Sequence, residues 1–293
     1  MIRTVIQQMR IRQWTKNFVV FAGVIFAHEF LDPVELARAA SGFLSFCLLA
    51  SAVYALNDLI DLPFDRVHPK KRSRPLPSGR ISPAGAVVLL VLLAGTGGAI
   101  ALFLGTGFAA IAGGYLLLNV AYTLRLKRVV MLDVLAISIG FVLRAVAGVA
   151  LLTEPVSLSP WLLLCTFFLA LFLAVSKRRH ERTLLQDQAE LHRKTLAEYP
   201  PELVDQMIPV VTAATVISYS IYTVAPGTIE RVGGADLVYT VPFVIFGVFR
   251  YLYVVFRKLE GGSPSETLLT DAPTLVNVLL WLSCVLYILY IPR

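Results

Sequence analysis

The chain has 293 residues, of which 57% are hydrophobic and 15% charged, and its mean hydropathy is +0.74. This composition excludes an ordinary soluble globular protein and is typical of a protein that crosses a membrane several times. The formal net charge is +7, but the basic residues lie in short loops between apolar runs, which argues against nucleic-acid binding. The three cysteines lie inside apolar runs, with neither metal-ligand spacing nor a disulfide pattern.

Apolar runs predict nine membrane-spanning helices, because a span needs about 20 mostly apolar residues. A basic segment, 1–16, precedes the first span and is expected to form an interfacial helix. The first span is the shortest, and only the turn Gly105-Thr106-Gly107 separates the third from the fourth. The expected spans are about 17–31, 36–60, 82–104, 106–124, 130–152, 158–177, 204–225, 236–256 and 272–291. We therefore predict an all-α membrane protein with a single domain, 1–293.

The basic residues of the loops predict the orientation of these spans. Five connections carry Lys and Arg, and the four that alternate with them carry almost none. Because cytoplasmic loops hold the excess of Lys and Arg, we expect the N-terminus in the cytoplasm. The longest polar stretch, 177–202, is expected to form a surface helix that caps the cytoplasmic mouth of the bundle.

Three carboxylates, Asp58, Asp61 and Asp65, end the second span and are followed at once by a basic loop, 66–74. On a helix that turns about 100° per residue they fall within roughly 60° of each other, so they can face one bound object. Charge at the edge of a span is costly and usually serves a site. Mg²⁺ is commonly held by one or two carboxylates together with phosphate oxygens, so the pattern predicts a site for Mg²⁺ and a phosphorylated ligand. The alternative is a solvated loop that only sets topology.

Further polar clusters lie at the same predicted face of the membrane. Tyr122 and Lys127 close the fourth span, which alone is an ordinary aromatic and basic boundary. After the sixth span, Lys177-Arg178-Arg179-His180-Glu181 offers charged donors that match phosphate oxygens. A boundary that only sets topology explains this segment equally well. Lys16 and Asn17, before the first span, either point into the site or anchor the chain at the interface.

Arg144 is expected to lie near the middle of the bilayer. It follows Asp133 by 11 residues, which is about 16 Å along a helix. An arginine at this depth almost always faces the bundle interior and has a partner. A structural ion pair is one option. Because no carboxylate is evident at a similar depth in the sequence, an anionic ligand is the preferred partner.

The motif Asn57-Asp58-x-x-Asp61-x-x-x-Asp65, with nine spans in this orientation, resembles the UbiA-type intramembrane prenyltransferase superfamily. The resemblance implies an all-helical ring around a central cavity open to the cytoplasm, with this motif binding Mg²⁺ and a diphosphate. The chain is more similar still to the decaprenyl-phosphate phosphoribosyltransferase branch. The matching motifs are Gln13-Trp14-x-Lys16-Asn17, Asp65-Arg66-x-His68-Pro69-x-Lys71-Arg72-x-Arg74-Pro75, Leu126-Lys127, Leu132-Asp133, Gly140-Phe141-x-x-Arg144-Ala145-x-Ala147-Gly148, Lys177-Arg178 and Gly262-x-Pro264-x-Glu266.

This branch implies transfer of 5-phosphoribosyl from phosphoribosyl diphosphate (PRPP) to a polyprenyl (decaprenyl) phosphate, with release of diphosphate, for cell-envelope arabinan precursors. The implied location is the bacterial plasma membrane, with the active site facing the cytoplasm. Asp58, Asp61 and Asp65 are implied as catalytic and Mg²⁺-binding residues. The implied substrate-binding residues are Lys16, Asn17, Asn57, Lys71, Arg72, Arg74, Tyr122, Lys127, Arg144, Lys177 and Arg178.

The chain departs from the wider superfamily after the sixth span. Aromatic prenyltransferases usually carry a second Asp-x-x-x-Asp motif there, whereas 177–181 is basic in this chain. A basic second cluster suits two anionic substrates better than a prenyl diphosphate and a neutral aromatic. The alternatives are a prenyltransferase with an aromatic or other small acceptor, and a transporter of phosphorylated solutes, for which no repeat pattern is evident. The sequence leaves open whether the chain forms a homo-oligomer.

Overall fold

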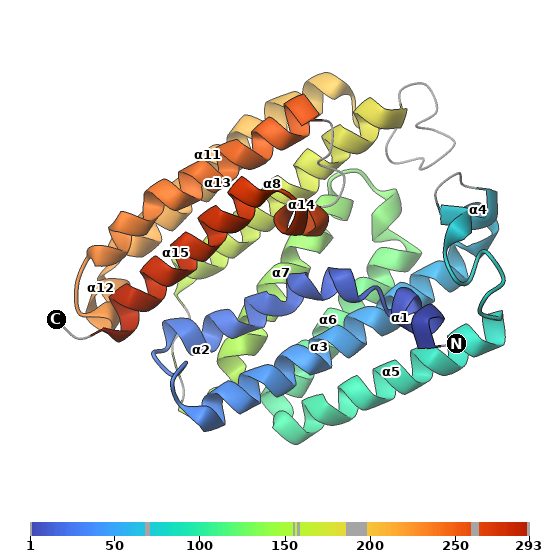
Figure 1. Cartoon of the computed structure of the whole chain (residues 1–293), viewed down its shortest axis with the longest axis horizontal. Coiled ribbons are helices and arrows are strands. Elements are labelled where there is room, and N and C mark those ends of the chain that lie inside the picture. The colour runs from blue at the N-terminus through green and yellow to red at the C-terminus, as the bar shows by residue number, and fades with distance from the viewer. Residues whose placement is uncertain are drawn as a thin grey trace. The chain divides into compact units, whose positions relative to one another are not determined.

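A computed structural model describes residues 2–67, 71–154, 156, 159–185, 198–258 and 264–291. Within these residues every regular element is a helix (Figure 1). They fall into two compact units. Unit 1 comprises Met1–Val24, Phe30–Leu126 and Leu143–Pro155, and unit 2 comprises Ile25–Glu29, Lys127–Val142 and Val156–Arg293.

Unit 1 contains the N-terminal helices, three long apolar helices that follow them, and the last part of α7. Its elements are α1 (Ile2–Met9), the 3-10 helix η1 (Ile11–Phe21), the start of α2 (Ala22–Phe26), α3 (Pro33–Ile60), α4 (Leu62–Val67), η2 (Lys71–Ser73), α5 (Pro83–Leu104) and α6 (Thr106–Leu124). Unit 2 contains η3 (Leu126–Arg128), most of α7 (Leu132–Ala150), α8 (Pro160–Leu185), α11 (Pro201–Val224), α12 (Pro226–Val232), η5 (Asp236–Thr240), α13 (Val241–Tyr253), the π-helical turn η6 (Val254–Lys258), α14 (Pro264–Thr270) and α15 (Ala272–Tyr290).

Capping residues fix where the long helices begin. The Asp32 side chain accepts hydrogen bonds from the backbone N–H groups of Val34 and Glu35, and Pro33 occupies the first turn of α3. Ser82 and Asp271 cap α5 and α15 in the same way. Each cap satisfies a donor that the helix itself leaves unpaired, and a proline at the first turn loses no helical hydrogen bond.

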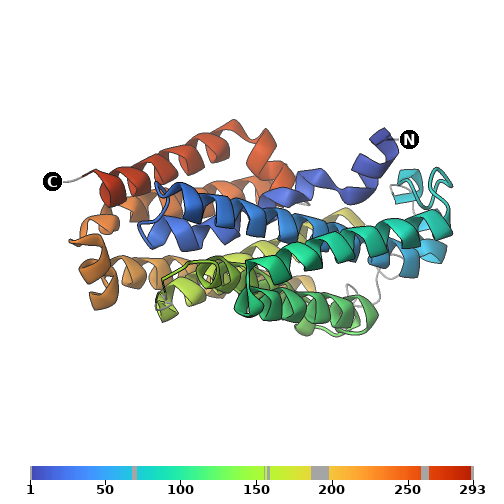
Figure 2. The ribbon, with the colours of Figure 1, turned by 90° about the horizontal axis from the view of Figure 1, so that it is seen from below.

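The core of unit 1 forms where α3 lies along α5, as Figure 2 also shows. The two helices approach closely at Gly97, whose carbonyl accepts a hydrogen bond from the Ser45 hydroxyl at 2.7 Å. Phe46 and Leu49 of α3 are fully buried there and pack with Phe108 of α6. The side of α5 that faces away from Gly97 is apolar and exposed, with Leu102 at 70% exposure. A face of this kind on a long apolar helix is the face that meets lipid.

In unit 2, α11 packs along α8 and α13 packs against α15. The first core cluster of this unit includes Val134, Val175 and Tyr199, and a second one is centred on Phe172 and Val255. These clusters join the start of α7, the end of α8 and the start of α11 in one packed body. Unit 2 therefore has its own core rather than borrowing one from unit 1.

Among the described residues, eight helices are long and apolar enough to cross a membrane, so this is an all-helical, multi-pass membrane protein. They match the second to ninth expected spans, and Gly105, with φ +128°, forms the expected break between α5 and α6. The first expected span, 17–31, differs, because it is divided between the end of η1 and the five-residue α2. Of the expected surface helix over 177–202, residues 177–185 are helical as the end of α8, but Arg178 and His180 are buried there. Residues 198–200 are not helical, and 186–197 lies outside the described residues.

The 3-10 winding of η1 gives it a three-residue repeat. Trp14, Asn17 and Val20 consequently share one face, and this face lies against α3 and the end of α7. Trp14 donates to the Ser51 hydroxyl at 3.1 Å, and Asn17 donates to Cys47 Sγ at 3.2 Å. A Cβ on Gly148 would lie only 2.1 Å from the Val20 carbonyl oxygen, so here the two backbones touch directly.

Candidate functional site

The aspartate motif lies at a break between two helices. Asp58 is in the last turn of α3, Asp61 follows the end of α3 with φ −87° and ψ 2°, and Asp65 lies in α4. The single continuous helix assumed from the sequence is therefore wrong. Pro63 accounts for the break, because a proline in the second position of α4 cannot continue the hydrogen bonding of α3.

Asp58 and Asp65 nevertheless point at one place. Both are buried, with 1% and 2% exposure, whereas Asp61 is only partly buried. Arg74 Nη1 lies 3.2 Å from Asp58 Oδ1 and 2.9 Å from Asp65 Oδ2. Lys71 Nζ lies 3.3 Å from the other oxygen of Asp65. The first and third aspartates thus surround a position that a cation already occupies, the Arg74 guanidinium.

Two residues of the N-terminal segment, neither of them predicted as a site residue, complete the surroundings of Asp58. Gln8 donates to Asp58 Oδ2 at 2.9 Å, and Arg10 donates to Asp58 Oδ1. Arg10 has φ +53°, in the left-handed region that non-glycine residues rarely adopt. Strain of this kind persists where surrounding contacts hold it. About 50 residues separate these partners, so no local pattern could have revealed the contact.

The oxygen donors at this position suit Mg²⁺. Two carboxylates converge on one cation, and Mg²⁺ sites typically use one or two carboxylates with the remaining positions taken by water and phosphate oxygens. In the part of the chain that the structure describes, no three His, Cys, Asp or Glu side chains form a complete ligand set. The residues present therefore fit a metal that shares its coordination with a phosphorylated ligand.

A second group of polar residues in unit 1 surrounds Arg144. Arg144 is 6% exposed, its Nε donates to Asn17 Oδ1 at 2.7 Å, and its Nη2 donates to the Tyr115 hydroxyl at 2.8 Å. Both of these partners are neutral, and they orient the guanidinium. Arg144 was expected to face the interior with a partner, and Asn17 and Tyr115 are the partners that the structure supplies.

Lys16 lies where η1 passes between these two groups. Burial is the main cause that lowers the pKa of Lys16, and the positive charges of Arg144 and Arg10 lower it further, to about 8 from an ordinary 10.5. The nearby Tyr122 acts in the opposite direction. A buried lysine is costly to charge, and a bound anion lowers that cost. The surroundings of Lys16 therefore favour an anionic ligand.

The structure places the other expected residues of unit 1 near the motif with different degrees of exposure. Asn57 is partly buried in the last turn of α3, where its carbonyl accepts the Asp61 N–H at 2.9 Å. Arg72 is exposed in η2. His68, Pro69 and Lys70 of the expected basic loop lie outside the described residues.

The expected site residues of unit 2 lie on two elements. Lys127 is in η3 and is partly buried. Lys177 and Arg178 are neighbours on α8, but the Lys177 side chain is 38% exposed and that of Arg178 is 3% exposed. Arg178 Nε lies 2.9 Å from Asp133 Oδ2, so this arginine is directed into the protein.

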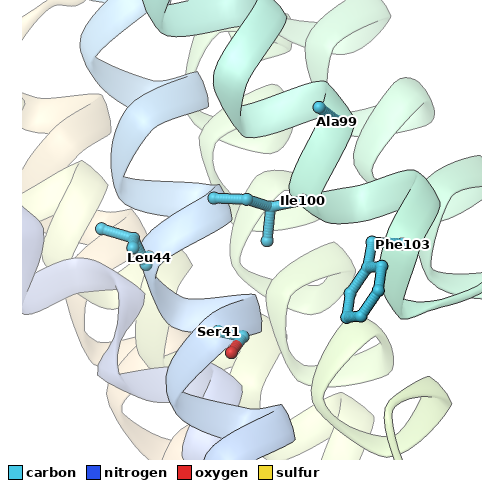
Figure 3. Close-up of a pocket in the computed structure, with 5 residues that line it drawn as sticks. All are labelled: Ser41, Leu44, Ala99, Ile100 and Phe103. Atoms are coloured by element: carbon cyan, nitrogen blue, oxygen red, sulfur yellow. The ribbon is translucent and has the colours of Figure 1, made fainter.

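A hollow of about 310 Å³ lies between α3 and α5 (Figure 3). It is lined by Ser41, Leu44, Ala99, Ile100 and Phe103. Ser41 precedes Asp58 by 17 residues, about 25 Å along the helix. The lining is almost entirely hydrocarbon, so this groove suits an apolar chain and is separate from the charged groups described above.

Comparison with known proteins identifies the family. Residues 17–270 match the model of the UbiA prenyltransferase family. The chain belongs to this family. It is 32% identical over 98% of its length to a decaprenyl-phosphate phosphoribosyltransferase of Corynebacterium glutamicum, of which it covers 86%. It is 30% identical over 97% of its length to the protein of the same name from Mycolicibacterium smegmatis, of which it covers 92%.

Solved UbiA structures share the fold. A UbiA homolog from Archaeoglobus fulgidus bound to GPP and Mg²⁺ superposes with a TM-score of 0.75 at 20% identity, over 98% of this chain and all of that one. A UbiA homolog from Aeropyrum pernix K1 superposes with a TM-score of 0.69 at 17% identity, over 94% and 98%. The predicted resemblance is confirmed, and the relatives support the predicted enzyme class, a polyprenyl-phosphate phosphoribosyltransferase.

The boundaries of the UbiA match separate two parts of the site. The matched range begins at residue 17, so it includes the aspartate motif and Arg144. Gln8, Arg10 and Lys16 precede it. The two N-terminal partners of Asp58, Gln8 in α1 and Arg10 just before η1, therefore lie outside the matched range.

Proposed function

We propose that this chain transfers 5-phosphoribosyl from PRPP to a polyprenyl (decaprenyl) phosphate and releases diphosphate. The acceptor phosphate oxygen forms a bond to C1 of the ribose as the bond from C1 to the diphosphate oxygen breaks, and the diphosphate leaves with the electron pair. The acceptor phosphate is already largely ionised near neutral pH, so no strong general base is needed. The protein's part is to align two anions and to exclude water.

The observation that carries this proposal is the convergence of Asp58 and Asp65 on one cation within a cluster of further cations. The Arg74 guanidinium marks a position suited to Mg²⁺, and Arg10 and Lys71 lie beside it. A neutral acceptor would not need so many positive groups. An anionic donor and an anionic acceptor need several positive groups, because their mutual repulsion has to be offset before they can meet.

The residues divide the task as follows. Asp58, Asp61 and Asp65 would hold Mg²⁺, which when bound offsets the charge that develops on the leaving diphosphate. Lys71, Arg72 and Arg74 bind the donor's phosphate oxygens, and Asn57 and Tyr122 contribute hydrogen bonds. Lys16, Asn17 and Arg144 orient an anionic group from the η1 side. Lys127 and Lys177 bind the remaining anionic oxygens of the two substrates.

The relatives support this assignment. The relatives that match at least 97% of this chain over at least 86% of their own length are named decaprenyl-phosphate phosphoribosyltransferase. In UbiA-type proteins with aromatic acceptors, a second acidic motif would be expected where this chain has Lys177 and Arg178. The basic character of this segment favours phosphoribosyl transfer over the alternative, prenyl transfer to an aromatic or other small acceptor.

We also propose the topology that goes with this function. The chain crosses the membrane nine times, with residues 17–31 as the first crossing, and the N-terminus and active site face the cytoplasm of a bacterial plasma membrane. The alternation of basic and non-basic loops supports this arrangement. PRPP is soluble and anionic, so it reaches the site from water, whereas the lipid acceptor arrives within the bilayer.

The decisive experiment is product formation by the purified protein with Mg²⁺, radiolabelled PRPP and decaprenyl phosphate. We expect a labelled lipid that disappears with EDTA. Asp58→Asn and Asp65→Asn should each lower the rate by about three orders of magnitude, because metal stabilisation of a leaving group is worth several kcal/mol and about 1.4 kcal/mol is tenfold in rate.

Glu29→Gln, a change at an acidic residue outside the motif, serves as the matched control and should retain activity. Folded wild-type protein that forms no labelled lipid from PRPP, but prenylates an aromatic acceptor from a prenyl diphosphate, would replace this proposal by the alternative.

A further inference from the structure

A buried carboxylate in unit 2 brings together three segments of the chain. Asp133, in the first turn of α7, has no exposed surface. Arg178 of α8 pairs with it at 2.9 Å, and Arg178 also pairs with Glu181. Tyr199, two residues before α11, donates from its hydroxyl to Asp133 Oδ1 at 2.6 Å. Tyr199 is 1% exposed, so its contact with Asp133 is closed to water.

Tyr199 also holds the turn that leads into α7. Its hydroxyl accepts a hydrogen bond from the Met131 N–H at 2.8 Å. Met131 has φ +68°, a left-handed conformation that costs a residue with a side chain free energy and has to be held by its surroundings. Lys127 lies four residues before Met131, in η3. The tyrosine hydroxyl therefore restrains the backbone that carries Lys127.

Three consecutive basic residues of α8, 177–179, differ in direction, because neighbours on a helix point about 100° apart. Arg178 points to Asp133, and Arg179 Nε lies 2.7 Å from Asp205 Oδ1 on α11. Lys177 is the accessible member, and its Nζ lies 3.7 Å from Glu181. The arginines thus join α8 to its neighbours, which leaves the lysine in position to meet a ligand.

We propose that Tyr199 is a positioning residue that holds Lys127 for a phosphoryl group of a substrate. Arg178 supports this arrangement by orienting Asp133, the hydrogen-bond partner of Tyr199. The same ion pair fixes the end of α8 that carries Lys177. The inference rests on the proposed function, and it changes the role of Arg178 from substrate contact to support. Tyr199 does not touch the substrate and acts through the Met131 backbone.

The hydroxyl is suited to this task across the physiological pH range. Burial, together with the hydrogen bond to the charged Asp133, raises the pKa of Tyr199. The phenol consequently stays protonated and keeps donating to Asp133 while it accepts from Met131. The phosphoryl group has two sources, the donor's diphosphate and the polyprenyl phosphate, and they can be tested separately.

The test compares Tyr199→Phe with wild type in the purified full-length chain. One arm titrates Mg²⁺ with inorganic diphosphate by calorimetry, and the other titrates a polyprenyl phosphate in nanodiscs. Loss of a hydrogen bond to a charged group predicts about tenfold weaker binding in one arm, which identifies the source. Tyr287, on α15, is 57% exposed. Tyr287→Phe is therefore the matched control and should bind both ligands as wild type does.

A double variant separates positioning from general stabilisation. Lys127→Gln alone should weaken the same arm, and adding Tyr199→Phe to it should cause no further loss, because the tyrosine acts through the lysine. Arg178→Lys keeps the buried positive charge, so it provides a second probe if Tyr199→Phe folds poorly, and it should weaken binding without abolishing it.

Three outcomes would overturn the inference. Tyr199→Phe could unfold at lower temperature yet bind both ligands as wild type does, which would make the network purely structural. The losses from Tyr199→Phe and Lys127→Gln could add, which would make them independent. Folded wild type could bind neither ligand, and only this outcome would also remove the proposed function.

Discussion

Asp58 in unit 1 and Asp133 in unit 2 are both buried carboxylates paired with arginine, but their partners differ in exposure. The side chains of Arg10 and Arg74, which pair with Asp58, are 23% and 31% exposed. The side chain of Arg178, which pairs with Asp133, is 3% exposed. The partners of Asp58 can turn toward water when another cation takes their place beside the buried carboxylate, whereas Arg178 has no such freedom.

This difference separates an exchangeable ion pair from a fixed one. A pair whose arginine is partly exposed contributes less free energy of folding, so exchanging the arginine for a metal costs little. A fully buried pair is strongly destabilising to break, because one uncompensated charge remains inside the protein. Sequence alone shows both as acidic and basic residues near a membrane boundary, and only the contacts distinguish site from scaffold.

The largest expected effect is on folding, and it tests the comparison directly. Asp133→Asn should lower the free energy of unfolding by about 3 kcal/mol or more, because it leaves Arg178 buried beside an amide. Asp58→Asn should lower it by less than about 1 kcal/mol, since Arg10 and Arg74 can be solvated. Denaturant unfolding of both variants in the same detergent measures the two values. Equal losses would erase the distinction between the two clusters.

The next largest effect is a pH dependence of Mg²⁺-diphosphate binding, which originates at Lys16 in unit 1. With a pKa of about 8, Lys16 loses its proton between pH 7 and pH 9, so Mg²⁺-diphosphate affinity should fall about tenfold over this range. Lys16→Arg should remove that fall, because arginine stays charged. Calorimetry at four pH values is sufficient, and the same slope in Lys16→Arg would assign the titration to another group.

The lowered pKa of Lys16 also predicts the sign of a pH dependence of the free energy of unfolding. Above about pH 8 the folded protein holds Lys16 neutral, while the unfolded chain keeps that proton up to about its ordinary pKa of 10.5. The unfolded state therefore binds more protons in this window, and the contribution of Lys16 to stability rises with pH between these values. Unfolding measured at pH 8 and pH 10, in wild type and in Lys16→Gln, isolates this contribution as the difference between the two chains.

The smallest effect is on metal binding. Arg10→Gln removes a cation that competes for Asp58, so Mn²⁺ alone should bind about fivefold more tightly, as expected for a partly exposed pair worth about 1 kcal/mol. Electron paramagnetic resonance of bound Mn²⁺ gives the affinity without substrate. Arg12→Gln, at an exposed arginine on the same segment, should bind as wild type does. Weaker Mn²⁺ binding by Arg10→Gln would show that Arg10 supports the site rather than competing for it.

Much of the fold could be predicted from sequence because membrane spans are long apolar runs. Hydropathy predicted α3, α5 and α6 within a few residues of their bounds. It did not predict η1, since a three-residue repeat produces no helical signal at 100° per residue. The interruption after Asp61 was predictable in principle, because Pro63 carries the signal for it.

The candidate site could be predicted in its residue types but not in its pairings. The aspartate motif and the basic loop are adjacent in sequence, so Arg74 beside Asp65 is a local outcome. Arg10 reaches Asp58 across 48 residues and Tyr199 reaches Asp133 across 66, and no periodic pattern connects such positions. Arg178 was expected to bind phosphate, and its ion pair with Asp133, 45 residues away in the chain, could not be predicted for the same reason.

The winding of η1 sets how far the N-terminal segment reaches. Gly23 is fixed against Gly148 by direct backbone contact, and Arg10 must extend from that anchor to Asp58. Eleven residues rise about 22 Å in a 3-10 helix but only about 17 Å in an α-helix, which is a difference of about 5 Å. Rewinding η1 as an α-helix would draw Arg10 away from the carboxylate without changing a single side chain. The backbone of this short segment therefore acts as a spacer whose length is part of the site.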